Sequence, residues 1–147
     1  MTWQQLLNLN RVRPHATSKQ ELDDLRTVID RDIHDAGIAG LSADRSFATA
    51  YNAALQTAKM AIACAGYRVT GQGHHQVSFE ATELAIGASV SQLVSYFELC
   101  RRKRNTLDYD VANVVSNSEA AELLQKAQEF KHEVETWIAA NHPNFMP

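Results

Sequence analysis

The spacing of the apolar residues constrains the fold of this chain more than any other feature. Across most of the sequence these residues recur every three or four positions, which is the period of one face of an α-helix and not that of a half-buried strand. The 147 residues include six glycines and three prolines, so long stretches contain no residue that interrupts a helix. We therefore expect an all-α protein, and no segment is predicted to form a strand.

The helical segments follow from this spacing and from the residues that flank it. A short first helix is expected at about residues 3–9, and the main helices at about 18–36, 42–65, 77–87, 89–104 and 116–142. Ser18 with Glu21, and Ser116 with Glu119, have the spacing of a capping box, which marks a helix start. Because most connections are short, we predict an antiparallel up-and-down bundle of four to five main helices plus the short N-terminal helix, in a single domain covering residues 1–147.

The composition is that of an ordinary globular domain and limits the classes of function. Hydrophobic residues make up 45% and charged residues 21%, which argues against disorder. The net charge of −3 disfavours a general nucleic-acid coat protein, so nucleic-acid binding would require a local patch. The N-terminus has no basic stretch before an apolar run, and the weakly polar stretch at residues 58–65 is too short to span a bilayer. We expect a cytoplasmic protein with no membrane segment.

Four consecutive cations, Arg101, Arg102, Lys103 and Arg104, close an apolar helical segment of this slightly acidic chain. A helix turns by about 100° per residue, so the four side chains cannot all serve one site. Arg101 and Arg104 are three residues apart and share a face, with Asn105 as a neighbour. A helix C-terminus favours cations by about 0.3–1 kcal/mol, which is the alternative explanation for the run. We predict an anion site on the face of Arg104, most plausibly for phosphate.

Two adjacent histidines, His74 and His75, lie on a glycine-rich turn before the fourth predicted helix, at about residues 77–87. They are candidates for a proton-transfer group or for a phosphate contact at a helix start, and turn or capping chemistry is the alternative. Adjacent histidines point apart, and no second pair of ligands at metal-binding spacing accompanies them, so we predict no metal site. A phosphate-cradling glycine loop is also missing from the sequence, and no cofactor is predicted. A composite site of Arg104 with His74 or His75 is a further hypothesis.

The motif Arg104-Asn105-x-Leu107-x-Tyr109 resembles the arginine–asparagine motif of the HEPN domains (higher eukaryotes and prokaryotes nucleotide-binding). The alanine-rich segment 51–65 and the last segment 122–137 also resemble helices of these domains, so the resemblance covers about residues 40–140. It implies a dimeric helical bundle, and many HEPN domains are ribonucleases of toxin–antitoxin and other defence systems, often paired with a nucleotidyltransferase. Carried over to this chain, the resemblance implies that Arg104 holds the scissile phosphate and that Asn105 orients by hydrogen bonding.

This chain departs from the HEPN ribonucleases at position 109, where tyrosine stands in place of histidine. A phenol with a pKa near 10 is a poor general base at neutral pH, whereas an imidazole with a pKa near 6.5 is well matched. Tyr109 can still stack on a base or donate a hydrogen bond. The residues therefore favour binding of nucleotide or RNA over its cleavage. The predicted site consists of Arg104, Asn105 and Tyr109, with further binding residues at Arg101, Arg102, Lys103, His74 and His75.

Two other functions are compatible with the sequence. In the first, the bundle is an interaction module, and its basic run docks an acidic protein such as a nucleotidyltransferase or an antitoxin. In the other it is a metal-independent ribonuclease, in which His74 or His75 replaces the missing motif histidine. Phosphate binding should weaken with rising salt, whereas a docking module would bind neither nucleotide nor RNA at any salt concentration.

Overall fold

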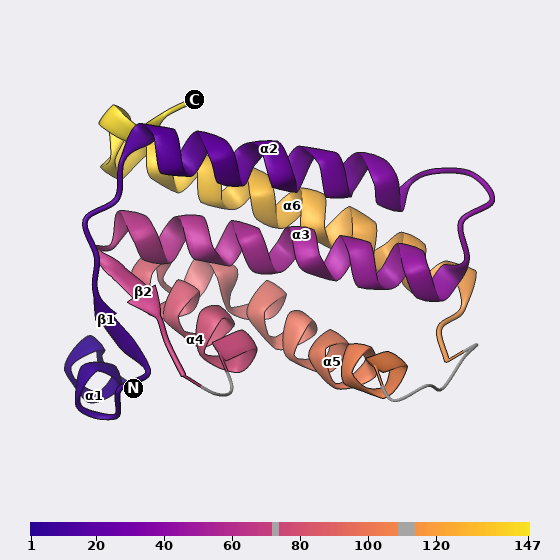
Figure 1. The fold of residues 1–147 in the computed structure, drawn as a ribbon, viewed down its shortest axis with the longest axis horizontal. Coiled ribbons are helices and arrows are strands. Elements are labelled where there is room, and N and C mark those ends of the chain that lie inside the picture. Colours follow the sequence, from indigo (N-terminus) through magenta and orange to yellow (C-terminus); the bar gives the residue numbers. More distant parts are fainter. Residues whose placement is uncertain (72–73, 109–113) are drawn as a thin grey trace.

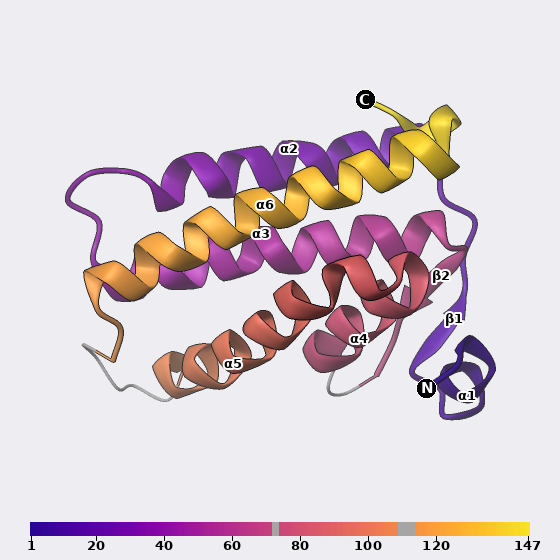
Figure 2. The ribbon, with the colours of Figure 1, turned by 180° about the vertical axis from the view of Figure 1, so that it is seen from behind.

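Helix α3 (Ala43–Cys64) is the central element of the computed structural model, which describes residues 1–71, 74–108 and 114–147. It contacts four other long helices: α2 (Lys19–Ala36), α4 (His74–Ile86), α5 (Ser91–Asp108) and α6 (Asn117–Asn141). Figures 1 and 2 show α2 and α6 on one side of α3, and α4 and α5 on the other. Helices α2 and α3 run antiparallel, as do α5 and α6. The predicted all-α bundle is confirmed, with five main helices and a short helix α1 (Trp3–Asn8).

A two-stranded antiparallel ribbon lies at one end of the bundle (Figure 1), and here the prediction of no strand is wrong. Strand β1 (Val12–Pro14) pairs with β2 (Tyr67–Val69), so that Arg13 lies opposite Arg68. Each strand has three residues, which is too short to display the two-residue period by which strands are recognised. Two short 3-10 helices, at Ala88–Val90 and Pro143–Phe145, complete the fold.

The alanines of α3 explain how one helix can touch so many others. Ala50, Ala53, Ala54, Ala58 and Ala61 are all fully buried. Alanine favours the helix intrinsically, and its small side chain lets neighbouring helices approach closely. The space that alanine leaves is filled by aromatic rings from the facing helices. Phe79 of α4, Phe97 of α5 and Phe130 of α6 lie with their ring centroids 5.0–6.4 Å apart.

Serine side chains begin three of the helices. At α6, Ser116 accepts from the backbone of Glu119, whose carboxylate returns to the backbone of Ser116, so the predicted capping box is confirmed. At α2 the cap is half of a box. Ser18 accepts from the backbone of Glu21, but the carboxylate of Glu21 turns to His15, whose Nε2 lies 2.8 and 3.1 Å from its two oxygens. This second partner draws the carboxylate of Glu21 away from the cap.

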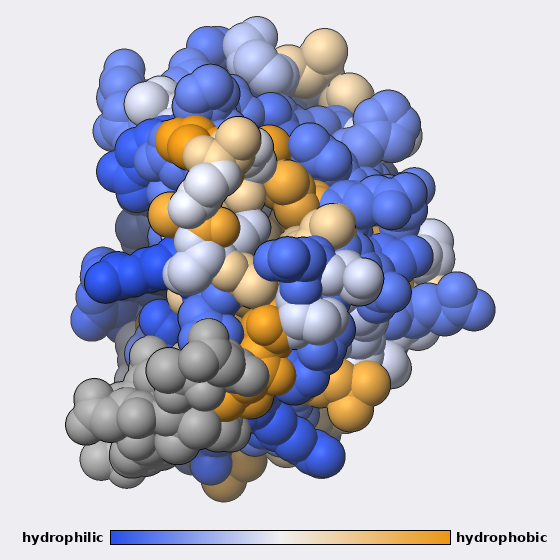
Figure 3. Space-filling view, turned by 90° about the vertical axis from the view of Figure 1, so that its right-hand side faces the viewer, coloured by the Kyte–Doolittle hydropathy of each residue, from blue (hydrophilic) through white to orange (hydrophobic). Residues whose placement is uncertain are grey.

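The surface of the bundle carries few large apolar side chains. Figure 3 faces the end that holds the α2–α3 connection and the end of α5, where apolar side chains lie exposed among polar ones. Ile38 and Leu41 of this connection are exposed, and Leu99 of α5 has 64% of its surface in solvent. None of the described helices has the length and apolar character needed to cross a membrane.

Candidate functional site

Tyr51 of α3 brings side chains of three helices into one polar cluster. Its ring is fully buried, and its hydroxyl lies 3.3 Å from Nδ1 of His75 at the start of α4. The guanidinium carbon of Arg104, near the end of α5, lies 5.4 Å from the centre of the same ring. This distance is within the range of a cation–π interaction, so the ring of Tyr51 attracts the cation while its hydroxyl contacts the imidazole.

The position of Tyr51 follows from the apolar face of α3. Its ring packs edge-on against Phe79, at a centroid distance of 5.9 Å, and belongs to the main core. A buried tyrosine requires a hydrogen-bond partner for its hydroxyl, and here the partner comes from α4. The core of the bundle therefore determines where the imidazole of His75 and the guanidinium of Arg104 meet.

Charged side chains of α5 act on the hydroxyl of Tyr51. Arg101 donates through Nε to Oε2 of Glu98 at 3.3 Å, and both arginines lie close enough to Tyr51 to act on its hydroxyl. Burial raises the pKa of Tyr51 well above its ordinary value of 10; the charges of Arg104 and Arg101 oppose this rise, and that of Glu98 adds to it. The phenol of Tyr51 therefore stays protonated beside the guanidinium of Arg104.

The four cations of the run point to different places, as the helical spacing predicts. Arg104 lies over the ring of Tyr51, and the charge of Arg101 acts on the same hydroxyl, whereas Lys103 forms an ion pair with Glu119 at the start of α6. Arg102 is exposed. Asn105 follows Arg104 on α5 and is partly buried. The side chain of Leu107 and the whole of Tyr109 lie outside the described residues.

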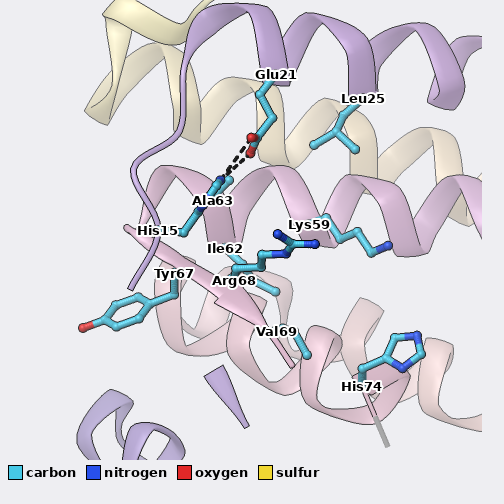
Figure 4. A pocket seen from close by; sticks show the side chains of 10 residues that line it. All are labelled: His15, Glu21, Leu25, Lys59, Ile62, Ala63, Tyr67, Arg68, Val69 and His74. Carbon is cyan, nitrogen blue, oxygen red and sulfur yellow. Dashed lines mark hydrogen bonds and ion pairs between the residues drawn. The ribbon is translucent and has the colours of Figure 1, made fainter. Parts of the chain in front are cut away.

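The two histidines also separate. Their rings are nearly perpendicular, with centroids 4.4 Å apart, and His75 contacts Tyr51. His74 instead lines a pocket with Lys59 and Arg68 (Figure 4). Of the two imidazoles, the structure brings that of His75 to the cluster of Arg104. Within the described ranges, no three His, Cys, Asp or Glu side chains are grouped so as to hold a metal ion.

The sequence alone does not predict that Tyr51 and Glu98 belong to the cluster. Tyr51 falls on the apolar stripe of its helix and is predicted as core, which it is, but its hydroxyl also serves the cluster. Glu98 lies one turn before Arg101 on α5, and the three-residue spacing of these opposite charges is the signal that could have identified it. In the described part of the chain, its second oxygen, Oε1, is buried without a hydrogen-bond partner.

The arrangement suits recognition of an oxyanion. A guanidinium carries its N–H donors in a planar fork that matches the oxygens of a phosphate or carboxylate, and an aromatic face beside it helps to fix its orientation. Comparisons of the chain with protein-family models, with curated proteins and with solved structures found no match. The structure is thus that of an all-α protein in which side chains from three helices form a cationic site. These side chains are Arg104, Arg101, Tyr51 and His75.

Proposed function

We propose that this protein is a HEPN-like helical protein that binds nucleotide or RNA phosphate through Arg104, assisted by Arg101 and Asn105. The observation that carries the proposal is the placement of the Arg104 guanidinium over the buried ring of Tyr51. Because Tyr51 is fixed in the core, the cation beside it is held in place before a ligand arrives, which lowers the entropy lost on binding. The Arg-Asn-x-Leu-x-Tyr motif that contains Arg104 supports the same class of protein.

The resemblance to HEPN domains also supplies the setting of this function. We infer a cytoplasmic homodimer in a toxin–antitoxin or other defence-type system, with a nucleotidyltransferase or antitoxin as its protein partner. Leu99 supports association because this exposed apolar side chain lies on α5, five residues before Arg104. A second copy of the chain docked there would lie close to the arginine cluster.

Fluorescence anisotropy with a labelled single-stranded RNA tests the proposed binding. The affinity should fall as salt rises from about 50 to about 200 mM, because phosphate contacts release counterions. Arg104→Ala should weaken binding at least about tenfold, the loss expected for a charge-assisted hydrogen bond. Arg31→Ala, which removes an exposed arginine of α2, should leave the affinity unchanged.

Equal affinities for Arg104→Ala and the unaltered protein would contradict the proposal. A failure of the protein to bind RNA or nucleotide at any salt concentration would favour the alternative, a bundle that docks an acidic protein partner through its basic run.

A metal-independent ribonuclease is the second candidate, and the contact between His75 and Tyr51 favours it. In the tautomer in which Nδ1–H of His75 donates to the hydroxyl oxygen of Tyr51, Nε2 is unprotonated and can accept a proton. Arg104 lies beside the same ring and would stabilise negative charge on the phosphate. His75 would thereby take the role that the motif position 109 cannot perform at neutral pH.

Cleavage of a labelled RNA in the presence of a metal chelator tests this second function. His75→Ala should abolish the cleavage, while His74→Ala should retain it because the ring of His74 lines a different pocket. Cleavage that is unchanged in His75→Ala would discard the role of His75.

A further inference from the structure

A second cationic site lies in a pocket between α2, α3 and β2. The cavity has a volume of about 350 Å³ and is lined by Lys59 of α3, Arg68 of β2 and His74 of α4. Figure 4 shows the side chains of Lys59 and Arg68 next to each other, with His74 on the far side of the pocket. Lys59 follows Tyr51 by eight residues on α3, which corresponds to about 12 Å along the helix. The cations of this pocket therefore lie apart from the Arg104 cluster, and the two sites adjoin through the neighbouring rings of His74 and His75.

The pocket is lined by two cations, Lys59 and Arg68, and by one carboxylate, Glu21. Within the described part of the chain, neither Lys59 nor Arg68 forms an ion pair or a side-chain hydrogen bond. Glu21 is the carboxylate that lines the pocket, and it is engaged by His15 at 2.8 Å and by Thr17 at 3.1 Å. The pKa of Glu21 is lowered, against the effect of burial, by its hydrogen bond to His15 and in smaller part by the charge of Arg68, so a single carboxylate faces the two cations.

The ribbon adds to this positive charge. Arg13 of β1 lies directly opposite Arg68 of β2, and opposite residues of a ribbon project from the same face. Like charges in this position destabilise a strand pair. Lys59 is half-buried, and its pKa is lowered by burial and by the charge of Arg68. Lys59 and Arg68 are thus held near each other against their mutual repulsion, an arrangement that a bound anion would stabilise.

We propose that this pocket binds a small phosphomonoester, with its dianionic phosphate at Lys59 and Arg68 and an apolar body against the apolar part of the pocket wall. Leu25, Ile62 and Val69 supply that apolar wall. The cavity volume is in the range of pockets for a single small ligand. A monoester brings two negative charges to the two lining cations, whereas each phosphodiester of an RNA strand brings one. The proposal does not depend on the function of the Arg104 cluster.

Isothermal titration with phenyl phosphate on the full chain tests the site. Phenyl phosphate should bind with a stoichiometry of one, and more tightly than inorganic phosphate because its ring occupies the apolar wall. Lys59→Met keeps the length of the side chain, removes its charge and should weaken binding at least about tenfold. Arg68→Gln, at an exposed strand position, provides a second variant and should weaken binding to a similar extent. Arg31→Gln on α2 removes the same charge elsewhere and should bind as the unaltered protein does.

Each contrary result overturns the proposal. Unchanged affinity in both Lys59→Met and Arg68→Gln, with the helical circular dichroism retained, would place the ligand elsewhere. Inorganic phosphate binding as tightly as phenyl phosphate would remove the role of the apolar wall. Displacement of phenyl phosphate by a short RNA would show that the pocket binds a nucleic acid and not a small phosphomonoester.

Discussion

At the scale of single residues, Tyr51 links the core of the bundle to its proposed chemistry. The ring satisfies the same packing that a phenylalanine would satisfy, since it is fully buried and packs against Phe79. The hydroxyl adds the contact with His75, and the face of the ring adds the contact with Arg104. Substitutions of Tyr51 can therefore separate the contribution of its ring to packing from the contribution of its hydroxyl to the contact with His75.

Tyr51→Phe should lower the free energy of unfolding by about 1 kcal/mol, because it removes one hydrogen bond and keeps the ring. Tyr51→Ala should lower it by about 3–5 kcal/mol, because it also leaves a cavity and removes the aromatic face from Arg104. Urea denaturation of the two variants measures both values. Equal losses in the two variants would contradict the part assigned to the ring.

The two cysteines, Cys64 and Cys100, are buried free thiols, and burial raises the pKa of each to about 11. We expect both to react very slowly with a thiol reagent at about pH 8, since the thiolate is the nucleophile. Their reactivity should reach that of an ordinary cysteine when the chain is unfolded in urea. Rapid labelling of the native protein would contradict the burial of these thiols.

The same pKa shifts predict how stability depends on pH. A thiol with a raised pKa keeps its proton in the folded protein at a pH where the thiol of the unfolded chain, with its ordinary pKa of 9.0, has lost it. The stabilisation is therefore complete below about pH 9 and decreases as the pH rises toward about 11. Urea unfolding across this range should show the decrease, and Cys64→Ala should make it shallower. A free energy of unfolding that rises with pH over this range would contradict the predicted sign.

At the scale of the elements, one buried arginine ties α2 to α6. Arg26 has 6% of its surface exposed and donates to both carboxylate oxygens of Glu135 at 2.9 Å. It also donates to Asp23 at 2.8 Å and to the carbonyl of Phe145 at 2.6 Å. Burial by itself lowers the pKa of Arg26, but its hydrogen bonds to Glu135 and Asp23 reverse this and raise it. The guanidinium thereby holds the last turn of the chain against the start of α2.

Removal of one partner should therefore be costly. Glu135→Ala should lower the free energy of unfolding by about 3 kcal/mol, because the buried guanidinium loses its main carboxylate. Glu133→Ala, at an exposed position of the same helix, should change it by less than about 0.5 kcal/mol. Urea denaturation of this matched pair measures the difference, and a small effect in both variants would show that Arg26 is adequately solvated without Glu135.

The elements also show what the sequence can and cannot predict. The five long helices follow from three- and four-residue spacing, which persists over enough turns to be recognised. Strands β1 and β2 are not predicted, because three residues are too few to display the two-residue period of a strand. Strand β1 also contains Pro14, a residue that is unfavourable in strands. The half-formed cap at Ser18 is not predicted either. The partner that competes for the carboxylate of Glu21 is His15, which lies before the helix and is not part of the capping-box spacing.

The candidate site is predictable only in part, for a similar reason. The helical repeat by itself places Arg101 and Arg104 on one face and turns Lys103 toward another partner. The meeting of Arg104 with His75 and Tyr51 depends on the packing of three helices, and no local spacing encodes it. The pocket of Lys59 and Arg68 depends likewise on the ribbon, which the sequence does not predict.

At the scale of the whole molecule, positive charge is concentrated at separate places on a chain whose net charge is −3. Arg104 lies near the end of α5, and the pocket of Lys59 is lined in part by β2. Figure 1 shows the end of α5 and strand β2 at opposite ends of the bundle. The exposed Leu99 belongs to the same helix as the first of these sites. A dimer formed through this part of α5 would place two arginine clusters near one interface.

Leu99→Asp should therefore shift the protein from dimer to monomer, because it places a charge in the proposed apolar contact. Leu9→Asp is the matched control, since Leu9 is 56% exposed but lies next to α1, away from α5. Size-exclusion chromatography with light scattering measures the mass of each variant at equal concentration. A monomeric parent protein, or a dimer that persists in Leu99→Asp, would contradict association through α5.

The central claim is that Arg104 itself binds phosphate, and the NMR signal of its Nε–Hε group reports this directly. The signal can be assigned by its loss in Arg104→Lys, and the unaltered protein is then titrated with a short single-stranded RNA. We predict a saturable shift of the Arg104 signal, accompanied by that of Arg101, while the exposed Arg31 on α2 stays in place. An Arg104 signal that does not move when the RNA is saturating would contradict the assignment of this cluster as the phosphate site.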